Sequence, residues 1–161
     1  MSPPSLVTVA VDDGVGALRL SDPDHRNALS AQLSDDLAGA VEAALAEGVG
    51  AIVLTAEPPV FCAGGSLAGL LSRDVPLSDL YRGFLALANA PVPTIAAVGG
   101  PAIGAGVNLP LACDVVVTSP RARFDPRFLD VGIHPGEATC GASSAGSAVR
   151  GRPPWCSAAT S

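Results

Sequence analysis

The chain has 161 residues, of which 48% are hydrophobic and 15% are charged. This length and composition indicate one domain with a buried core and exclude a disordered chain. The formal net charge is −6, and the basic residues are arginines scattered along the sequence. Because phosphate binding needs a clustered basic face, a nucleic-acid partner is excluded as well.

The cysteines and the apolar runs do not indicate a metal site, a disulfide framework or a membrane segment. Cys62, Cys113, Cys140 and Cys156 are widely spaced, without a C-x-x-C pair or a histidine at ligand spacing. The longest apolar run, around residues 95–98, is far too short to span a membrane. The N-terminus also lacks the pattern of a signal peptide. We therefore expect a cytoplasmic protein with free thiols, no metal and no membrane contact.

The first part of the chain predicts two strands, a helix and a third strand. Residues 6–11 and 16–20 are short apolar segments on either side of an Asp-Gly turn. Residues 31–46 form an amphipathic helix, and Ser30 is placed to cap it. The apolar positions of this helix are Leu33, Leu37, Val41 and Leu45. Residues 51–55 are continuously apolar, which is typical of a strand buried on both faces.

The following part predicts two further helices and two further strands. Residues 77–90 form a helix with one apolar side. That side carries Leu80, Phe84, Leu87 and Ala88. Residues 94–98 and 115–118 are apolar runs that indicate buried strands, and between them lie a glycine-rich turn at 99–106 and a short helix at 107–112. The alternation of strands and helices is typical of the α/β class.

Two glycine-rich loops, residues 61–67 and 100–106, each follow a strand-like run. Glycines in this place let backbone N–H groups face a ligand oxygen. Two such donors directed at one thioester oxygen would form an oxyanion hole. The alternative is that both loops are only tight turns. Neither loop is a dinucleotide-binding fingerprint or a phosphate-binding loop with its lysine.

Several segments of the chain resemble the crotonase, or enoyl-CoA hydratase/isomerase, family in sequence, order and spacing. They are NALS at 27–30, FCAGGSL at 61–67, TIAAVGGP at 94–101, GAGVNL at 104–109, ACD at 112–114 and LDVGIHPG at 129–136. The resemblance covers roughly residues 5–136. It implies an α/β fold of the crotonase-like (ClpP/crotonase) type, a spiral of β-β-α repeats that binds a coenzyme A thioester as substrate and needs no other cofactor.

The resemblance also assigns positions around the thioester. Gly65 and Ala105 match the backbone donors of the oxyanion hole. Ala63 and Leu67 match positions that contact the adenine through the backbone. Arg26 lies in a segment that contacts the pantetheine and phosphates in other members, although a solvated surface arginine is the alternative.

This sequence departs from the family at its catalytic carboxylates. Hydratases of the family use two glutamates, and the matching positions are Asn108 and Phe128. Neither side chain can exchange a proton, so water addition by two carboxylates is not expected. Asp130 is the candidate acid–base residue, and a surface carboxylate is the alternative reading for it. Asn108 and Phe128 would then only line the substrate pocket.

Residues 137–161 differ from the 1–136 core and consist largely of Ala, Ser, Gly, Pro and Arg without an apolar pattern. This composition predicts a disordered tail. With GC-rich codons shifted by one base, residues 137–145 would read GGHLWRLQR, which would continue the family's His-Pro-Gly sequence. We therefore hypothesise a frameshift near codon 136. The C-terminal helical part of the family would then be missing, which makes the family's trimers or hexamers doubtful for this chain.

Three functional readings follow from these residues. The first is an acyl-CoA lyase or isomerase of fatty acid metabolism that stabilises a thioester enolate through Gly65 and Ala105. The second is a protein that binds acyl-CoA without catalysis. The third is an inactive, truncated remnant.

Overall fold

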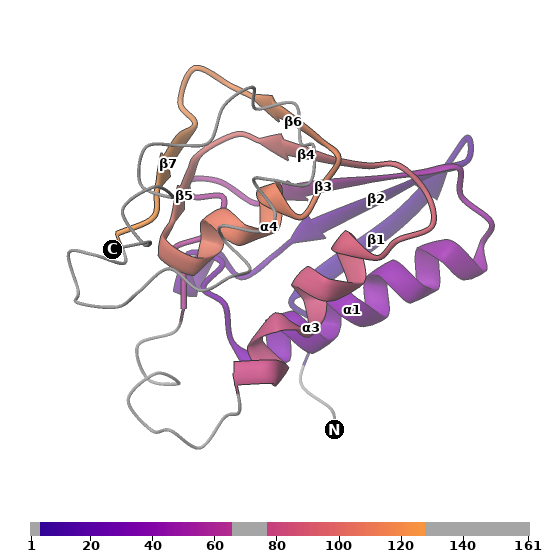
Figure 1. Ribbon diagram of the computed structural model, residues 1–161, viewed down its shortest axis with the longest axis horizontal. Coiled ribbons are helices and arrows are strands. Elements are labelled where there is room, and N and C mark those ends of the chain that lie inside the picture. Colours follow the sequence, from indigo (N-terminus) through magenta and orange to yellow (C-terminus); the bar gives the residue numbers. More distant parts are fainter. Residues whose placement is uncertain (1–3, 66–76, 128–161) are drawn as a thin grey trace, which may run out of the picture.

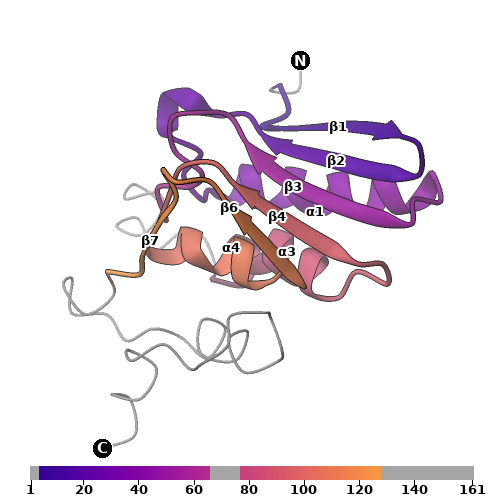
Figure 2. The same cartoon turned by 90° about the horizontal axis from the view of Figure 1, so that it is seen from above.

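The structure, a computed structural model, describes residues 4–65 and 77–127. Within them, one sheet has the strand order β1-β2-β3-β4-β6, and β5 and β7 form a second, two-stranded sheet. Helices α1 and α3 cover one face of the large sheet, and α4 packs near α3 (Figures 1 and 2). The strands are β1 (Val7–Asp12), β2 (Val15–Leu20), β3 (Ala51–Ala56), β4 (Thr94–Val98), β5 (Pro101–Ile103), β6 (Val115–Thr118) and β7 (Arg123–Asp125). The helical elements are η1 (Pro23–His25), α1 (Ala31–Ala46), α3 (Leu77–Ala88), η2 (Gly104–Val107) and α4 (Asn108–Leu111).

Strands β1 and β2 form the predicted hairpin, with boundaries shifted by one residue. They are antiparallel, and the pairing runs from Val7 opposite Leu20 to Asp12 opposite Val15. The two turn residues, Asp13 and Gly14, both have positive φ, at 45° and 74°. Such a turn matches the right-handed twist of the strands, and aspartate followed by glycine tolerates it best. The remaining strand pairs of the large sheet are parallel.

Helix α1 has the bounds and the cap that the sequence predicts. The Ser30 hydroxyl accepts a hydrogen bond from the N–H of Leu33 at 3.1 Å. Of the predicted apolar stripe, Leu33, Leu37 and Val41 are fully buried and Leu45 is partly buried. The helix also comes close to the sheet, because a Cβ on Gly16 would lie 2.9 Å from the Cβ of Ala44. The glycine in β2 therefore permits the tight packing of α1.

Helix α3 packs on α1 through a buried polar contact as well as apolar side chains. The Ser34 hydroxyl of α1 donates to the carbonyl of Leu80 at 3.0 Å and accepts from the N–H of Gly83 at 2.9 Å. Phe84 and Leu87 are buried beside this contact. The expectation that Ala88 belongs to the apolar side is wrong, because Ala88 is exposed. Gly83 lies on the buried side instead, where it allows the two helices to approach closely.

Strands β3 and β4 are fully buried on one face only and β6 on neither, which corrects the expectation of strands buried on both. In β3, Ile52 and Leu54 are completely buried, whereas Val53 between them is partly exposed. In β6, Val115 and Val117 are 43% and 56% exposed. The reason is that both α1 and α3 lie on the same face of the sheet, as Figure 2 shows, and that β6 is an edge strand.

The predicted glycine-rich turn at 99–106 contains a strand and a helical turn that the sequence did not reveal. Strand β5 pairs in parallel with β7, with Ala102 opposite Phe124. Ala102 also forms a bridge with Cys62 on its other side. The short strands β5 and β7 carry little periodicity of their own, so their pairing depends on partners that are distant in sequence.

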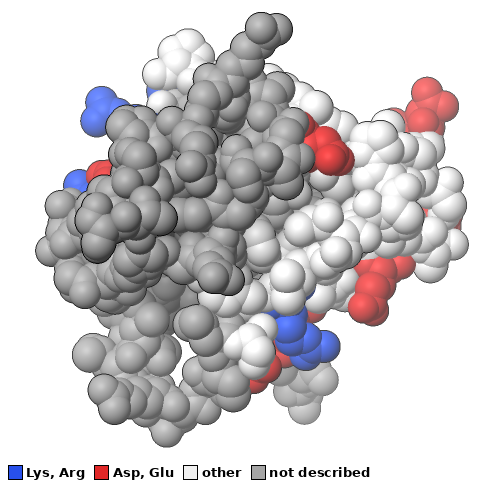
Figure 3. Space-filling view, in the orientation of Figure 1, with Lys and Arg blue, Asp and Glu red and all other residues white. Residues whose placement is uncertain are grey.

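The surface of the described residues is mostly uncharged on the face in Figure 3, where the charged side chains stand in small separate groups. Two ion pairs on the described surface are Arg82–Asp35 at 2.8 Å and Arg127–Asp125 at 2.6 Å. No helix within residues 4–65 and 77–127 is both long enough and apolar enough to cross a membrane.

Candidate functional site

The two glycine-rich loops lie against each other after β3 and β4. The N–H groups of Phe61 and Cys62 both donate to the carbonyl of Pro101, at 2.9 and 3.2 Å. The N–H of Ile103 in turn donates to the carbonyl of Cys62 at 2.9 Å. These reciprocal bonds join the loops backbone to backbone. They bring Gly65, at the end of the first described segment, into the neighbourhood of Ala105.

The close approach of the loops requires glycine at two positions. Gly64 has φ +94°, and a Cβ on it would lie 2.7 Å from the carbonyl oxygen of Ile103 and 3.6 Å from the nitrogen of Ala105. A Cβ on Gly106 would lie 2.6 Å from the carbonyl oxygen of Cys62. A side chain at either position would push the loops apart. The glycines noted in the sequence thus fix the distance between the candidate donors.

The N–H groups of Gly65 and Ala105 remain available for a ligand within the described part of the chain. Neither group is a donor in the backbone hydrogen bonds found among these residues. On the other side of the first loop, the N–H of Leu29 donates to the carbonyl of Gly64 at 2.7 Å and holds it in place. Two fixed, unused N–H donors on adjacent loops are what binding of one carbonyl oxygen requires.

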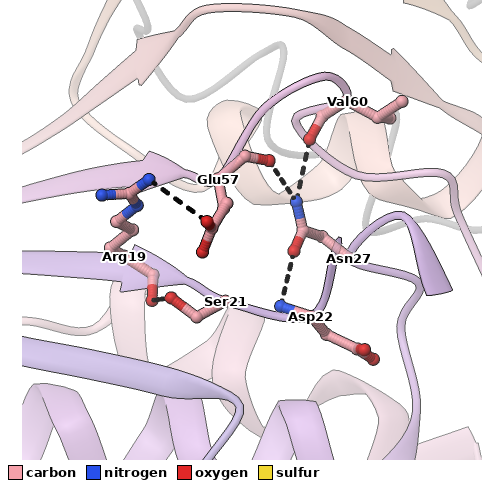
Figure 4. Close-up of polar contacts among 6 residues, drawn as sticks. All are labelled: Arg19, Ser21, Asp22, Asn27, Glu57 and Val60. Atoms are coloured by element: carbon pink, nitrogen blue, oxygen red, sulfur yellow. Dashed lines mark hydrogen bonds and ion pairs between the residues drawn. The ribbon is translucent and has the colours of Figure 1, made fainter. Parts of the chain in front are cut away.

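Asn27 organises the loop before the site, and sequence reasoning gave it no role. Its side chain is fully buried and makes three hydrogen bonds (Figure 4). The amide donates to the carbonyls of Glu57 and Val60 at 3.0 and 2.8 Å. Its oxygen accepts from the N–H of Asp22 at 2.9 Å. The available signal in the sequence was an asparagine directly after a turn. Asparagine tolerates the positive φ that the structure shows at this position.

Arg26 is exposed in the turn after η1, next to the first glycine-rich loop. Its carbonyl accepts a hydrogen bond from the N–H of Ala63 at 3.1 Å, so the predicted phosphate contact and the predicted adenine contact are neighbours. His25 is paired with Asp22 at 2.8 Å, and this hydrogen bond raises the pKa of the exposed imidazole. Asp22 and Asp24 lie in the same turn, so its basic side chains are accompanied by acidic ones. A role of Arg26 or Ala63 in coenzyme A binding stays a prediction.

Asn108, at the start of α4, is buried and lies one helical turn beyond Ala105. Its side chain is only 1% exposed, and its N–H donates to the carbonyl of Ala105. Its carboxamide interacts with the hydroxyl of Tyr81 on α3. Burial raises the pKa of Tyr81, and the interaction with Asn108 lowers it in part. Tyr81 was not identified from the sequence, because its proximity to Asn108 depends on the packing of α3 against α4.

The described cysteines, Cys62 and Cys113, are buried. Burial raises the pKa of Cys62 to about 11 and that of Cys113 to about 12, so both thiols are protonated at neutral pH. Neither forms a disulfide within the described part of the chain. Among the described residues, no group of three or more His, Cys, Asp or Glu side chains is placed to hold a metal ion.

The remaining predicted site residues lie outside the described residues. They are Leu67, Phe128 and Asp130, together with the tail at 137–161. The structure therefore brings together Gly65, Ala105 and Asn108 and places Arg26 beside Ala63. It gives no position for the candidate acid–base residue.

Comparisons with known proteins place this arrangement in a family. Residues 10–143 match the family model described as Enoyl-CoA hydratase/isomerase. A Mycobacterium tuberculosis protein named a probable enoyl-CoA hydratase is 42% identical over 136 residues, covering 81% of this chain and 53% of that protein. An Arthrobacter 4-chlorobenzoyl coenzyme A dehalogenase is 38% identical over 137 residues, covering 79% of this chain and 50% of the dehalogenase. The chain thus spans about half the length of the curated relatives it matches.

Solved structures agree with the sequence comparison. A Thermobifida fusca protein crystallised in complex with CoA has a TM-score of 0.73 and 29% identity, covering 86% of this chain and 59% of its own. An enoyl-CoA hydratase from Polaromonas has a TM-score of 0.75 and 33% identity, covering 84% of this chain and 56% of its own. The predicted crotonase-like fold is confirmed. The chain therefore belongs to the enoyl-CoA hydratase/isomerase (crotonase) family.

Proposed function

We propose that this protein binds an acyl-CoA thioester with the thioester oxygen between the N–H groups of Gly65 and Ala105. The observation that carries the proposal is a pair of N–H groups that donate no backbone hydrogen bond among the described residues, on loops that Gly64 allows to approach closely. Family membership and a related structure solved with CoA support it. A donor of this kind contributes about 3 kcal/mol to stabilising a developing negative charge on oxygen.

The chemistry beyond binding is limited by Asn108. A carboxamide neither takes up nor releases a proton at neutral pH, so the position matching the first family glutamate cannot activate water. Phe128, which matches the second family glutamate, cannot exchange a proton with water either. An enolate reaction such as isomerisation remains compatible with the donor pair, and Asp130 is the candidate to move its proton.

A second function, acyl-CoA binding without turnover, is favoured by the same buried carboxamide. Asn108 fills the place of a reactive carboxylate with a neutral group. The two functions differ in whether the bound thioester forms an enolate. They can be separated by following deuterium exchange at the α-carbon of butyryl-CoA in D2O by NMR, since only enolate formation exchanges that proton.

The proposal is tested by measuring the binding of butyryl-CoA and of free CoA to the whole chain by calorimetry. Gly64→Ala should weaken butyryl-CoA binding by about tenfold or more, because its Cβ would separate the loops and the two donors. Gly99→Ala is the matched control, since its Cβ would meet nothing within 4 Å and binding should not change.

Circular dichroism and thermal melting would establish that both variants are folded. Equal affinity of folded Gly64→Ala and wild type for butyryl-CoA would contradict the placement of the thioester oxygen. Absence of butyryl-CoA binding by the wild-type chain would contradict the function itself.

A further inference from the structure

A pocket of about 210 Å³ lies where β3, β4 and β6 end. Its lining comes from the connections that follow these strands: residues 56 and 58–61 after β3, residues 99–100 after β4, and Arg121 after β6. Gly65, Ala105 and Asn108, which surround the candidate thioester site, do not line it. Ligands of open α/β sheets bind outside the carboxyl ends of the strands. The pocket is therefore placed where a ligand can bind, apart from the thioester oxygen.

The wall that follows β3 is held in place by Asn27. The carboxamide of Asn27 donates to the carbonyls of Glu57 and Val60, on either side of two successive prolines (Figure 4). This wall lies directly against the end of β4, because a Cβ on Gly100 would overlap the carbonyl oxygen of Pro59. Proline also restricts the backbone through its fixed φ. The pocket wall is thus fixed before any ligand arrives.

Ser119 fixes Arg121 at the other side of the pocket. Its hydroxyl donates to the carbonyl of Gly99 at 3.0 Å and accepts from the N–H of Arg121 at 3.1 Å. One side chain therefore joins two of the lining residues, the first after β4 and the second after β6. The backbone that carries the guanidinium has a defined position relative to the end of β4.

The pocket offers a positive charge to a ligand. Among the residues that line it, Arg121 alone has an ionisable side chain. Its guanidinium is exposed and forms no ion pair with a described residue, whereas Arg82 and Arg127 are paired with carboxylates. The N–H groups of Gly99 and Gly100 also donate no backbone hydrogen bond among the described residues. A positive charge without a partner favours an anionic ligand group.

The rest of the lining is apolar and selects against an anion that is polar on all sides. It consists of Ala56, Pro58, Pro59, Val60 and Phe61, besides the two glycines. A phosphate or sulfate ion would leave oxygens without hydrogen bonds against these groups. A carboxylic acid has its charge at one end and an apolar body at the other. Since an apolar cavity of about 150 Å³ binds benzene, the pocket has room for a ring or a branched chain of similar size.

We propose that this pocket binds a small monocarboxylic acid with an aromatic or branched apolar group. The carboxylate pairs with the guanidinium of Arg121, and the apolar group lies against Val60 and the two prolines. Because Arg121 is exposed and its ion pair is weakened by solvent, the dissociation constant should be about millimolar. The inference concerns a separate site and holds whether or not the chain binds an acyl-CoA.

The test follows the binding of 4-fluorobenzoate to the whole chain by 19F NMR titration at constant ionic strength. Arg121→Gln should weaken binding about tenfold, because the charged hydrogen bonds are lost. Arg123→Gln is the matched control, since Arg123 is an exposed arginine outside the lining, and it should leave binding unchanged. Circular dichroism would establish that both variants are folded.

Two further ligands test the two halves of the proposed recognition. Wild type should bind 4-fluorobenzyl alcohol, which has the ring without the charge, about tenfold more weakly than 4-fluorobenzoate, and Arg121→Gln should not change that affinity. Sulfate at equal concentration should not displace 4-fluorobenzoate. Equal losses in the two arginine variants, or displacement by sulfate, would show a response to charge alone and overturn the site. Absence of saturable binding to wild type would overturn it as well. Neither result bears on the titration with butyryl-CoA, which tests the proposed function separately.

Discussion

Asn27 shows how a single buried side chain can hold the loops around a site. Its three hydrogen bonds join the backbone at Asp22 to the backbone at Glu57 and Val60, which lie before the first glycine-rich loop (Figure 4). Its φ of +53° is tolerated by asparagine better than by most residues. The same segment places the carbonyl of Arg26 on Ala63. The position of the candidate coenzyme A contacts therefore depends on a residue that would touch no substrate.

Removing the Asn27 carboxamide should destabilise the protein strongly. Asn27→Ala leaves buried backbone groups without their partner, and we expect a loss of about 3 kcal/mol in the free energy of unfolding. Asn89→Ala is the control, because Asn89 is exposed and its carboxamide donates to the carbonyl of Leu85, a single contact within its own helix end among the described residues. That change should stay within about 0.5 kcal/mol. Urea denaturation measures both, and similar losses would show that the Asn27 network is not structural.

Helices α1 and α3 pack closely on each other on the helical side of the large sheet. Their contact combines buried leucines with the Ser34 hydroxyl, which binds backbone groups of α3. The close approach leaves no space at Gly83, whose Cβ would lie 2.8 Å from the carbonyl oxygen of Ser34 and 3.0 Å from Leu37. Gly39 on α1 is different, because a Cβ there would meet nothing within 4 Å.

The two helix glycines should therefore respond to alanine with opposite signs. Alanine favours a helix over glycine by about 1 kcal/mol, so Gly39→Ala should stabilise the protein by roughly that amount. Gly83→Ala has the same propensity gain but must displace α1, and we expect a net loss of about 1–3 kcal/mol. Thermal and urea unfolding would measure both. Stabilisation by both variants would mean that α3 is not tightly packed on α1.

The arrangement of layers decides which strand positions contribute to stability. In the described part of the chain, helices cover one face of the large sheet, so β2, β3 and β4 alternate between buried and more exposed side chains. Val98 of β4 is 1% exposed, whereas Val117 of the adjacent β6 is 56% exposed. The two valines therefore lie on different faces of the sheet, Val98 on the covered face and Val117 on the open one.

Truncation of these two valines tests the layer arrangement. Val98→Ala should cost about 2 kcal/mol, from the lost burial and the cavity that remains. Val117→Ala should change the free energy of unfolding by less than about 0.5 kcal/mol, as at other exposed positions. Unfolding in urea measures both. A comparable loss at Val117 would show that the open face is covered in solution.

The sequence by itself determined the local elements and the family. The Ser30 cap with its apolar stripe defined α1, and the Asp13-Gly14 turn defined the first hairpin, because these signals arise from neighbouring residues. The resemblance of the two glycine-rich loops to the family predicted Gly65 and Ala105 as candidate donors. Their relation to the family came from ordered motifs along the chain and was confirmed over residues 10–143.

The tertiary structure alone decided the features that depend on distant contacts. An apolar run has the same sequence pattern whether one face or both faces of the strand are covered. The open face of β3 and β6 could therefore not be predicted. Strands β5 and β7 exist through pairing with each other across about twenty residues of chain. Helix α3 meets α1 through Ser34 and Gly83, which lie 49 residues apart in the sequence. Such proximity is a property of packing, and no local pattern encodes it.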